Sequence, residues 1–207
     1  MQFYFVRHGE SEANVLNVFA NRQPELHPLT AKGRQQAEAL AHEFSSLDIR
    51  CVYSSPLLRA RETAEIIAQA AGAPHKIADA LSEFDCGIFE GETFAAGADI
   101  YNGVMQSWLD GKSDQRIEGG ESFNEIRERF VPFVIGLIAQ YRDQSGDIVI
   151  VAHGGLFRCT LSLVMSNIDL AFTIANHLEN TGYVRAEPYG DKLICREWCG
   201  QLLDNLS

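Results

Sequence analysis

A nearly continuous apolar run from Asp147 to Ala152 constrains the fold of this chain more than any other feature. Such a run is typical of a strand in the middle of a parallel sheet, where both faces are covered. Gly154 and Gly155 then turn the chain into a helical pattern that extends to about Met165. Because parallel strands are joined by crossover connections, we expect strands and helices to alternate along the chain.

Further strands are predicted on both sides of this run. Phe3–Val6 and Ile49–Ser54 are short runs rich in aromatic and β-branched residues, and 182–198 has the pattern of two more strands. The alternation favours an α/β fold, a three-layer α/β/α sandwich with a mostly parallel central sheet and right-handed crossovers. A length of 207 residues suits one domain, so we expect a single domain over 1–207.

Helix boundaries are marked by capping residues. Thr30 is a predicted N-cap, and Ser55–Pro56 supplies an N-cap with proline at the first helical position. Gly72 is expected to stop the second of these helices. Ser122–Glu125 forms a capping box before a long helix, in which Pro132 predicts a kink rather than an end.

Three of the predicted strand ends carry arginine or histidine. Arg7 and His8 follow the first strand, Arg59 comes shortly after the second, and His153 follows the apolar run. Ligands of such folds bind at the carboxyl ends of the strands. We therefore expect these four side chains to converge on one edge of the sheet.

Several common catalytic motifs are absent from the sequence. It has no phosphate-binding G-x-x-x-x-G-K-[ST] loop, no dinucleotide-binding G-x-G-x-x-G after a strand and no G-x-S-x-G elbow. No cysteine has an arginine six positions later, and the histidines lack the H-x-H and H-E-x-x-H spacings of metal sites. The sequence therefore predicts a site with neither metal nor cofactor.

The remaining constellation suits phosphate. The guanidinium groups of Arg7 and Arg59 match phosphate oxygens, and helix N-termini behind Ser55 and Gly154 are expected to add backbone donors. Arginine charge would keep a neighbouring histidine neutral, as a nucleophile requires. An acid must then protonate the leaving oxygen.

Charge and cysteine content limit the partners and the location. Lysine and arginine number 17 against 28 aspartate and glutamate, giving a formal net charge of −11. Such a chain is a poor candidate for nucleic-acid or membrane binding, so anions must be bound in a local basic pocket. Five scattered cysteines and a first segment unlike a signal peptide favour the cytoplasm, with idle thiols.

The motifs together resemble those of the histidine phosphatase superfamily, the phosphoglycerate mutase-like fold. The matching blocks follow one another from residue 3 to about 160: Arg7-His8-Gly9-Glu10 with Asn14, Arg22-Gln23, Pro28-Leu29-Thr30 with Gly33 and Gln36-Ala37, Ser54-Ser55-Pro56 with Arg59-Ala60 and Thr63-Ala64, Leu81 to Gly91 with Glu83, Gly119-Gly120-Glu121-Ser122 with Arg127, and His153-Gly154-Gly155. The block at 81–91 looks like that of the phosphatase branch.

The resemblance implies roles for individual residues. His8 would be phosphorylated, Arg7, Arg59 and His153 would hold the phosphoryl group, and Glu83 would be the general acid. The residues expected to bind phosphate are Arg7, Asn14, Gln23, Arg59, His153 and Gly154. Glu83 would afterwards activate the water that hydrolyses the phosphohistidine, and the phosphate charge would raise its pKa. The expected function is metal-independent hydrolysis of a small phosphorylated metabolite.

Several alternatives stay open at this point. A mutase of the phosphoglycerate type and an inactive phosphate-binding scaffold would share this fold, and a homodimer is possible. Specificity is expected in a short substrate-pocket excursion at about 92–118. The aromatic residues near it line either the pocket or the core: Phe84, Phe89, Phe94, Tyr101 and Trp108. Likewise, Gly9, Gly154 and Gly155 either serve simple turns or permit close approach to phosphate.

Overall fold

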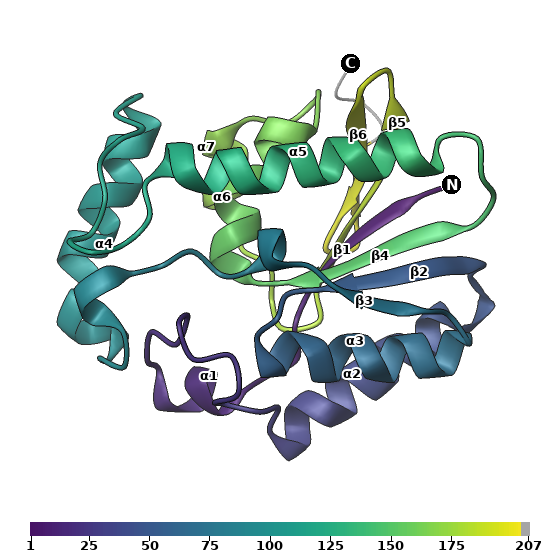
Figure 1. The fold of residues 1–207 in the computed structure, drawn as a ribbon, viewed down its shortest axis with the longest axis horizontal. Coiled ribbons are helices and arrows are strands. Elements are labelled where there is room, and N and C mark those ends of the chain that lie inside the picture. The colour runs from purple at the N-terminus through teal and green to yellow at the C-terminus, as the bar shows by residue number, and fades with distance from the viewer. Residues whose placement is uncertain (204–207) are drawn as a thin grey trace.

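The computed structural model describes residues 1–203, and its strands form one seven-stranded sheet (Figure 1). The order across the sheet is β3-β2-β4-β1-β5-β6-β7. The strands are β1 (Phe3–Arg7), β2 (Ile49–Ser54), β3 (His75–Ile77), β4 (Asp147–Ala152), β5 (Tyr183–Tyr189), β6 (Lys192–Trp198) and β7 (Gln201–Leu202). The apolar run of β4 lies between β2 and β1, in the middle of the sheet as predicted.

The sheet has a parallel half and an antiparallel half. β1, β2 and β3 run parallel to their neighbours around β4, whereas β5, β6 and β7 are joined as antiparallel strands. The prediction of a mostly parallel sheet therefore holds for the central strands around β4, and the strands from β5 onward are antiparallel. Sequence patterns did not reveal the short edge strands β3 and β7, because two or three residues are too few to show a period.

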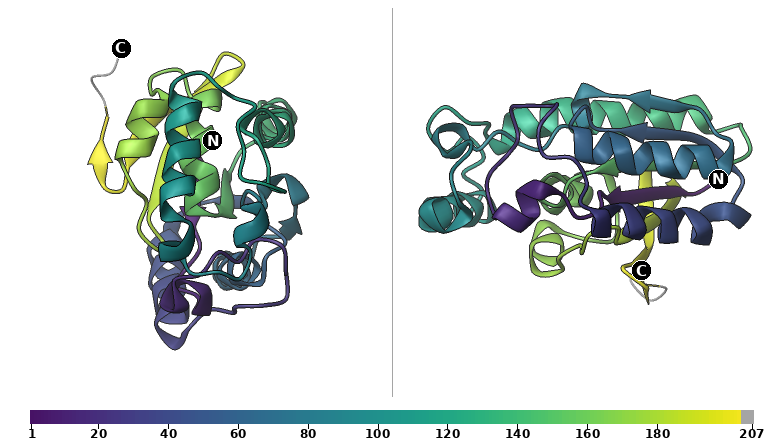
Figure 2. Two further views of the ribbon diagram at one scale, coloured as in Figure 1. Left: turned by 90° about the vertical axis from the view of Figure 1, so that its left-hand side faces the viewer. Right: turned by 90° about the horizontal axis from the view of Figure 1, so that it is seen from below.

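Helices cover both faces of the sheet (Figures 1 and 2). The α-helices are α1 (Glu12–Leu16), α2 (Ala31–Glu43), α3 (Leu58–Ala71), α4 (Phe94–Leu109), α5 (Phe123–Tyr141), α6 (Gly154–Val164) and α7 (Leu170–Ala175). Single turns of 3-10 helix occur at Phe44–Ser46, Asp79–Leu81 and Gly87–Phe89. In Figure 1, α2 and α3 lie below the parallel strands and α5 and α6 lie above them, which makes the predicted three layers.

The two hydrophobic cores follow from the alternation of side chains along the strands. Phe3, Phe5 and Ile150 belong to the larger core under α5 and α6. Tyr4 and Val6, from the alternate positions of β1, belong to the smaller core under α2 and α3. Both faces of β1 and β4 are thus buried, and the chain at their carboxyl ends is held firmly.

Most predicted caps are present, with one exception. Thr30 accepts a hydrogen bond from the N–H of Gly33, and Ser122 and Glu125 form the capping box. The prediction for Ser55–Pro56 was wrong, because α3 begins at Leu58 after an extended Leu57. The Ser55 hydroxyl accepts the Leu57 N–H and also contacts His153, so it serves the site instead of capping the helix.

The long helix α5 continues through Pro132 and does not end there. The segment 92–118 holds α4, which stands beyond the carboxyl ends of the parallel strands at one end of the molecule (Figure 1). Its position brings the predicted excursion beside the strand ends on which the site depends. Over residues 1–203, no helix combines the length and the apolar character needed to cross a membrane.

Candidate active site

The carboxyl ends of β1, β2 and β4 meet at one edge of the sheet. In the ladder, Arg7 is opposite Ala152, and Ser54 is opposite Val151. The backbone pairing continues one residue further, since the N–H of His8 donates to the carbonyl of Ala152. The predicted convergence of strand ends is therefore present.

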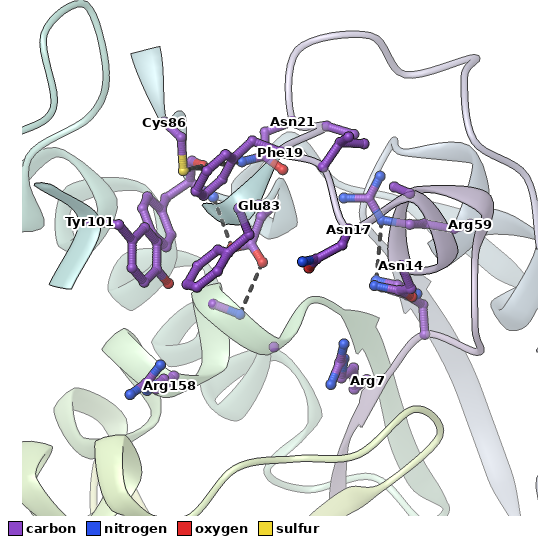
Figure 3. A pocket seen from close by; sticks show the side chains of 18 of the residues that line it. Arg7, Asn14, Asn17, Phe19, Asn21, Arg59, Glu83, Cys86, Tyr101 and Arg158 are labelled. Carbon is purple, nitrogen blue, oxygen red and sulfur yellow. Dashed lines mark hydrogen bonds between the residues drawn. The ribbon is translucent and has the colours of Figure 1, made fainter. Parts of the chain in front are cut away.

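A cavity of about 350 Å³ opens at this edge (Figure 3). Its size falls within the range of small-molecule sites, which is about 300–1,000 Å³. The residues that line it are Arg7, His8, Ala13, Asn14, Asn17, Val18, Phe19, Ala20, Asn21, Arg59, Glu83, Phe84, Cys86, Phe94, Tyr101, Gly154, Gly155, Arg158 and His177.

His8 is held in one tautomer by its two neighbours. Its Nδ1 lies 2.7 Å from the carbonyl oxygen of Gly9, which can only accept, so the proton is on Nδ1. Arg59 Nε donates to Nε2 at 3.1 Å, which requires a lone pair there. Burial, with the charges of Arg59 and Arg7, lowers the pKa of His8 well below its usual value. Nε2 is therefore the unprotonated, nucleophilic nitrogen.

Three buried nitrogens near His8 have no hydrogen-bond partner within residues 1–203. They are Nε of Arg7, Nη1 of Arg59 and Nδ1 of His153. Buried polar atoms without partners are rare in folded proteins, and each one requires an explanation. A phosphoryl group at the cavity floor would supply oxygens for the two arginine nitrogens, which belong to lining residues, so the site is complementary to phosphate.

His153 packs against His8 and is not in the cavity lining. The centres of the two rings are 5.1 Å apart, and the His153 ring is completely buried. Its Nε2 contacts the Ser55 hydroxyl at 2.7 Å. Burial and the charge of Arg59 lower the pKa of His153 well below its usual value, so this ring is also neutral.

Of the other predicted phosphate contacts, two line the cavity and one does not. The Asn14 side-chain oxygen accepts hydrogen bonds from Ser11 and Asn180, and its amide nitrogen has no acceptor in the part of the chain that the structure describes. Gly154 lines the cavity at the start of α6. Gln23 is exposed and outside the lining, in the turn where its carbonyl accepts from Leu26.

At each of the two helix starts predicted to supply backbone donors, one N–H group is already used. At α3, the Leu58 N–H donates to the carbonyl of Pro24. At α6, the Gly155 N–H donates to the Glu83 carboxylate at 2.9 Å. The N-terminus of α6 therefore contacts the candidate acid through the N–H of Gly155, beside the cationic side chains that line the cavity.

Glu83 is half-buried and lines the same cavity as His8, and in Figure 3 Arg7 and Arg59 lie to one side of it. Burial raises the pKa of its carboxyl, although the backbone N–H groups of Phe84 and Gly155 oppose this. The pKa of Glu83 is thus raised, as predicted, before any phosphate binds, and the cause is burial. A Cβ on Gly155 would lie 2.8 Å from both carboxylate oxygens, so the glycine permits the close approach of Glu83.

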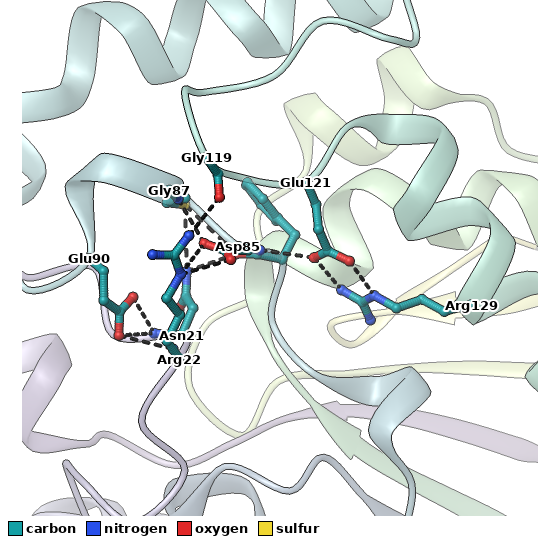
Figure 4. A network of polar contacts seen from close by, with 10 residues as sticks. Asn21, Arg22, Asp85, Gly87, Glu90, Gly119, Glu121 and Arg129 are labelled. Carbon is teal, nitrogen blue, oxygen red and sulfur yellow. Dashed lines mark hydrogen bonds and ion pairs between the residues drawn. The ribbon is translucent and has the colours of Figure 1, made fainter.

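Polar contacts hold the loop that carries Glu83 (Figure 4). Arg22 pairs with Asp85 at 2.8 Å and donates to the carbonyl of Gly119. Glu121 accepts the Asp85 N–H and pairs with Arg129 at 2.8 Å. These contacts join three separate segments of the chain beside Glu83. Glu90, at the far end of the loop, accepts the N–H groups of residues 21 and 22 and so ties a turn.

The aromatic residues divide between the pocket and the core. Phe84, Phe94 and Tyr101 line the cavity, whereas Phe89 and Trp108 are buried outside the lining. Of the aromatic residues near 92–118, three therefore line the pocket and two belong to the core.

Other lining residues were missed from sequence. Phe19 adds an aromatic side chain, and Asn17 adds an amide. His177, between α7 and β5, also lines the cavity and accepts a hydrogen bond from Arg7 at 2.9 Å. Arg158 was not singled out, although its position four residues after Gly154 places it on the same face of a helix.

Groups of three or more histidine, cysteine, aspartate or glutamate side chains that could hold a metal ion do not occur within residues 1–203. The cavity instead combines fixed cations, neutral imidazole and one carboxyl of raised pKa. That set suits phosphoryl transfer, which depends on positioning and neutralisation of charge.

The comparison with protein families agrees with this geometry. A model of the histidine phosphatase superfamily (branch 1) matches residues 3–200. The chain belongs to the histidine phosphatase superfamily. The resemblance of the motifs is confirmed, and the chain is an enzyme of the histidine phosphatase type.

Relatives within the superfamily differ in their names. The chain is 33% identical over 165 residues to a protein of Salmonella choleraesuis named probable phosphoglycerate mutase GpmB, covering 80% of this chain and 75% of that one. A mycobacterial glucosyl-3-phosphoglycerate phosphatase superposes with a TM-score of 0.81 at 23% identity, over 97% and 99% of the two chains. An alpha-ribazole phosphatase from Shigella flexneri gives 0.75 at 23%, over 96% of each. The structural likenesses confirm the predicted fold.

Proposed function

We propose that this protein is a metal-independent phosphomonoester hydrolase that acts through a phosphohistidine on His8. Its substrate is a small phosphorylated metabolite. The observation that carries the proposal is the arrangement around His8 Nε2, where buried nitrogens of Arg7 and Arg59 lack partners among residues 1–203 and Glu83 lines the same cavity. The location in the cytoplasm and the single domain stay predictions from sequence.

In the first step, His8 Nε2 attacks phosphorus in line and the bond from phosphorus to the ester oxygen breaks. Arg7, Arg59 and His153 donate to the equatorial oxygens, where charge is spread in the transition state. Glu83, whose raised pKa keeps it protonated to higher pH, gives its proton to the leaving oxygen. The products are an alcohol and a phosphohistidine.

In the second step, water replaces the alcohol. Glu83 is now ionised and takes a proton from the water, whose oxygen attacks phosphorus and displaces the imidazole. His8 leaves as the neutral ring, with its proton still on Nδ1 beside the Gly9 carbonyl. Inorganic phosphate then departs and the site returns to its first state.

A mutase of the phosphoglycerate type is the second candidate. The relative at 33% identity is named as one, so this activity has a specific observation behind it. A mutase must keep water from the phosphohistidine, whereas a phosphatase admits it. The two differ in a direct assay, because a mutase interconverts 2- and 3-phosphoglycerate and a phosphatase releases inorganic phosphate from them.

The test is a panel of phosphomonoesters assayed for phosphate release with a chelator present. We expect turnover in the chelator, and a fall of about 10⁴-fold or more in His8→Ala, as for other lost nucleophiles. His42→Ala is the matched control, since His42 is exposed on α2 away from the cavity. Turnover that survives His8→Ala contradicts the proposal. Phosphate binding without turnover indicates the scaffold alternative.

A further inference from the structure

A third arginine lines the cavity besides the two assigned to the phosphoryl group. Among residues 1–203, seven arginines pair with a carboxylate within 4.0 Å: Arg22, Arg34, Arg61, Arg116, Arg129, Arg185 and Arg196. Arg7, Arg59 and Arg158 all line the cavity, and none of them appears in such a pair. Arg50, Arg127 and Arg142 are also outside such pairs among the described residues, but they do not line the cavity. In a chain with a net charge of −11, three arginines gathered in one pocket without a carboxylate partner mark a site for anions.

Arg158 is placed by α6 and held at one nitrogen. It follows Gly154 by one helical turn, so both residues face the cavity. Its Nε donates to the carbonyl of Ile174 in α7 at 3.2 Å, which anchors the side chain. Neither terminal nitrogen has a partner in the described part of the chain. A half-buried guanidinium in this state offers its planar pair of donors to a ligand.

The position of Arg158 relative to Glu83 shows which part of a substrate it meets. In Figure 3, Arg158 and Tyr101 lie on one side of Glu83, and Arg7 and Arg59 lie on the other. Glu83 protonates the ester oxygen in the proposed mechanism. The leaving group therefore extends from Glu83 toward Arg158, on the side away from the phosphoryl group.

Near Arg158, Tyr101 adds a polar hydroxyl to the aromatic wall formed with Phe84 and Phe94. Its ring packs against Phe84 and Phe94 with centroid distances of 5.8 and 5.4 Å. Its hydroxyl, on the side facing Arg158 in Figure 3, has no hydrogen-bond partner among the described residues. A donor hydroxyl beside a guanidinium is suited to an anionic oxygen.

We propose that Arg158 and Tyr101 form a second anion subsite, which binds a carboxylate or phosphate on the leaving group. The assignment to the leaving group rests on the proposed function. The subsite itself rests on the placement of Arg158. The substrate is thus a phosphomonoester with a second anionic group, whose carbon framework lies along Phe84 and Phe94.

The test measures binding of non-hydrolysable phosphonates, so that it does not depend on turnover. We would titrate phosphonoalkanoates with two to five methylenes, each beside its neutral terminal amide, and α,ω-bisphosphonates of the same lengths. For the best length, the wild type should bind the anionic member about 10- to 100-fold more tightly than the amide, as for hydrogen bonds to charged groups. A comparison of the phosphonoalkanoates with the bisphosphonates shows whether the subsite binds a carboxylate or a phosphate more tightly.

Arg158→Gln removes the charge and should abolish this preference, with the amide series changing less than about threefold. Arg158→Lys should keep part of it. Arg142→Gln is the matched control, since Arg142 is exposed and, among residues 1–203, its side chain donates a hydrogen bond only to the Gly190 carbonyl. The subsite is refuted if no length prefers the anion, or if the preference survives in Arg158→Gln. Failure of the proposed function would instead show as absent turnover, with this preference intact.

Discussion

The two sides of the cavity are held in different ways. On the nucleophile side, His8 and His153 follow directly from neighbouring strands, and their side chains are 3% and 0% exposed. On the leaving-group side, Glu83 belongs to a loop with no strand beneath it. That loop is fixed by ion pairs such as Arg22–Asp85, whose side chains are 44% and 30% exposed.

The difference separates two kinds of sensitivity. Backbone ladders between buried strands are insensitive to salt, whereas exposed ion pairs are screened by it and contribute about 0–1 kcal/mol each. We therefore expect the phosphate-binding side to be robust and the acid side to respond to solvent and to small changes of sequence. The predictions below address one side or the other, from the largest expected effect to the smallest.

The largest effect is expected on the nucleophile side. Arg59→Ala removes the donor to His8 Nε2 and the free Nη1, and with them the neutralising charge. We expect kcat/KM to fall by about 10³- to 10⁴-fold for every phosphomonoester, because this charge serves the phosphoryl group itself. Steady-state assays across substrates check it. A loss confined to some leaving groups contradicts the division between the sides.

Glu83→Gln should separate substrates by leaving group. With alkyl phosphates we expect kcat to fall by about 10²- to 10⁴-fold, the range for lost general acids. With p-nitrophenyl phosphate, phosphorylation of the enzyme needs no acid and should be nearly unaffected in a pre-steady-state burst. An equal loss of the burst and of alkyl-phosphate turnover contradicts the assignment of the acid.

The pH profile is a second test of Glu83 as the general acid. Because the pKa of Glu83 is raised, its acidic form persists above the usual carboxyl range, and kcat/KM for alkyl phosphates should fall as pH rises through that pKa. The lowered pKa of His8 keeps the nucleophile neutral on the acid side of this limb. The alkaline limb should disappear in Glu83→Gln. A profile that is flat from pH 5 to 8 contradicts this prediction.

Gly155→Ala should disturb the acid and the Phe84 ring beside it, and leave the phosphate-binding side intact. The added Cβ would lie 2.9 Å from Cε1 of Phe84. The added Cβ meets both carboxylate oxygens of Glu83 at 2.8 Å, so the carboxyl must move. Since a displacement of about 1 Å can cost 10²-fold, we expect kcat for alkyl phosphates to fall by about 10- to 100-fold, with phosphate affinity retained. Gly136→Ala in α5, where a Cβ meets nothing within 4 Å, is the control. Loss of phosphate binding would contradict the separation of the two sides.

The smallest effect is expected at the ion pairs. Glu121→Gln weakens the contact with Arg129 and keeps an acceptor for the Asp85 N–H, so kcat should fall only about two- to fivefold. Raising the salt concentration should also lower kcat of the wild type. It should lower kcat of Glu121→Gln less, because that variant has already lost part of the ion-pair network. A variant as impaired as Glu83→Gln would show that this network does more than position the loop.

The nucleophile side could be predicted from sequence because its signals are local. A buried strand followed by Arg7 and His8, or by His153, fixes the position of the side chain at the sheet edge. Ser55 was misread because its hydroxyl meets His153 from a distant strand, a contact that local capping patterns do not contain.

The other side depends on contacts between distant segments. Glu83 was found through the family motif, since nothing in its own loop distinguishes it from a solvated glutamate. His177 and Arg158 were missed because only the packing of α6 and of the segment after α7 brings them to the cavity. Gln23 followed the motif but lies outside the lining, so its role in phosphate binding stays a prediction.

The central claim is a phosphohistidine at His8, and Glu83→Gln offers the means to trap it. With p-nitrophenyl phosphate this variant should be phosphorylated quickly and hydrolysed slowly, because the second step lacks its base. After rapid quenching at alkaline pH, peptide mass spectrometry should find one phosphoryl group, labile to acid, on His8. Absence of a phosphoenzyme, or a phosphoryl group on another residue, would contradict the account.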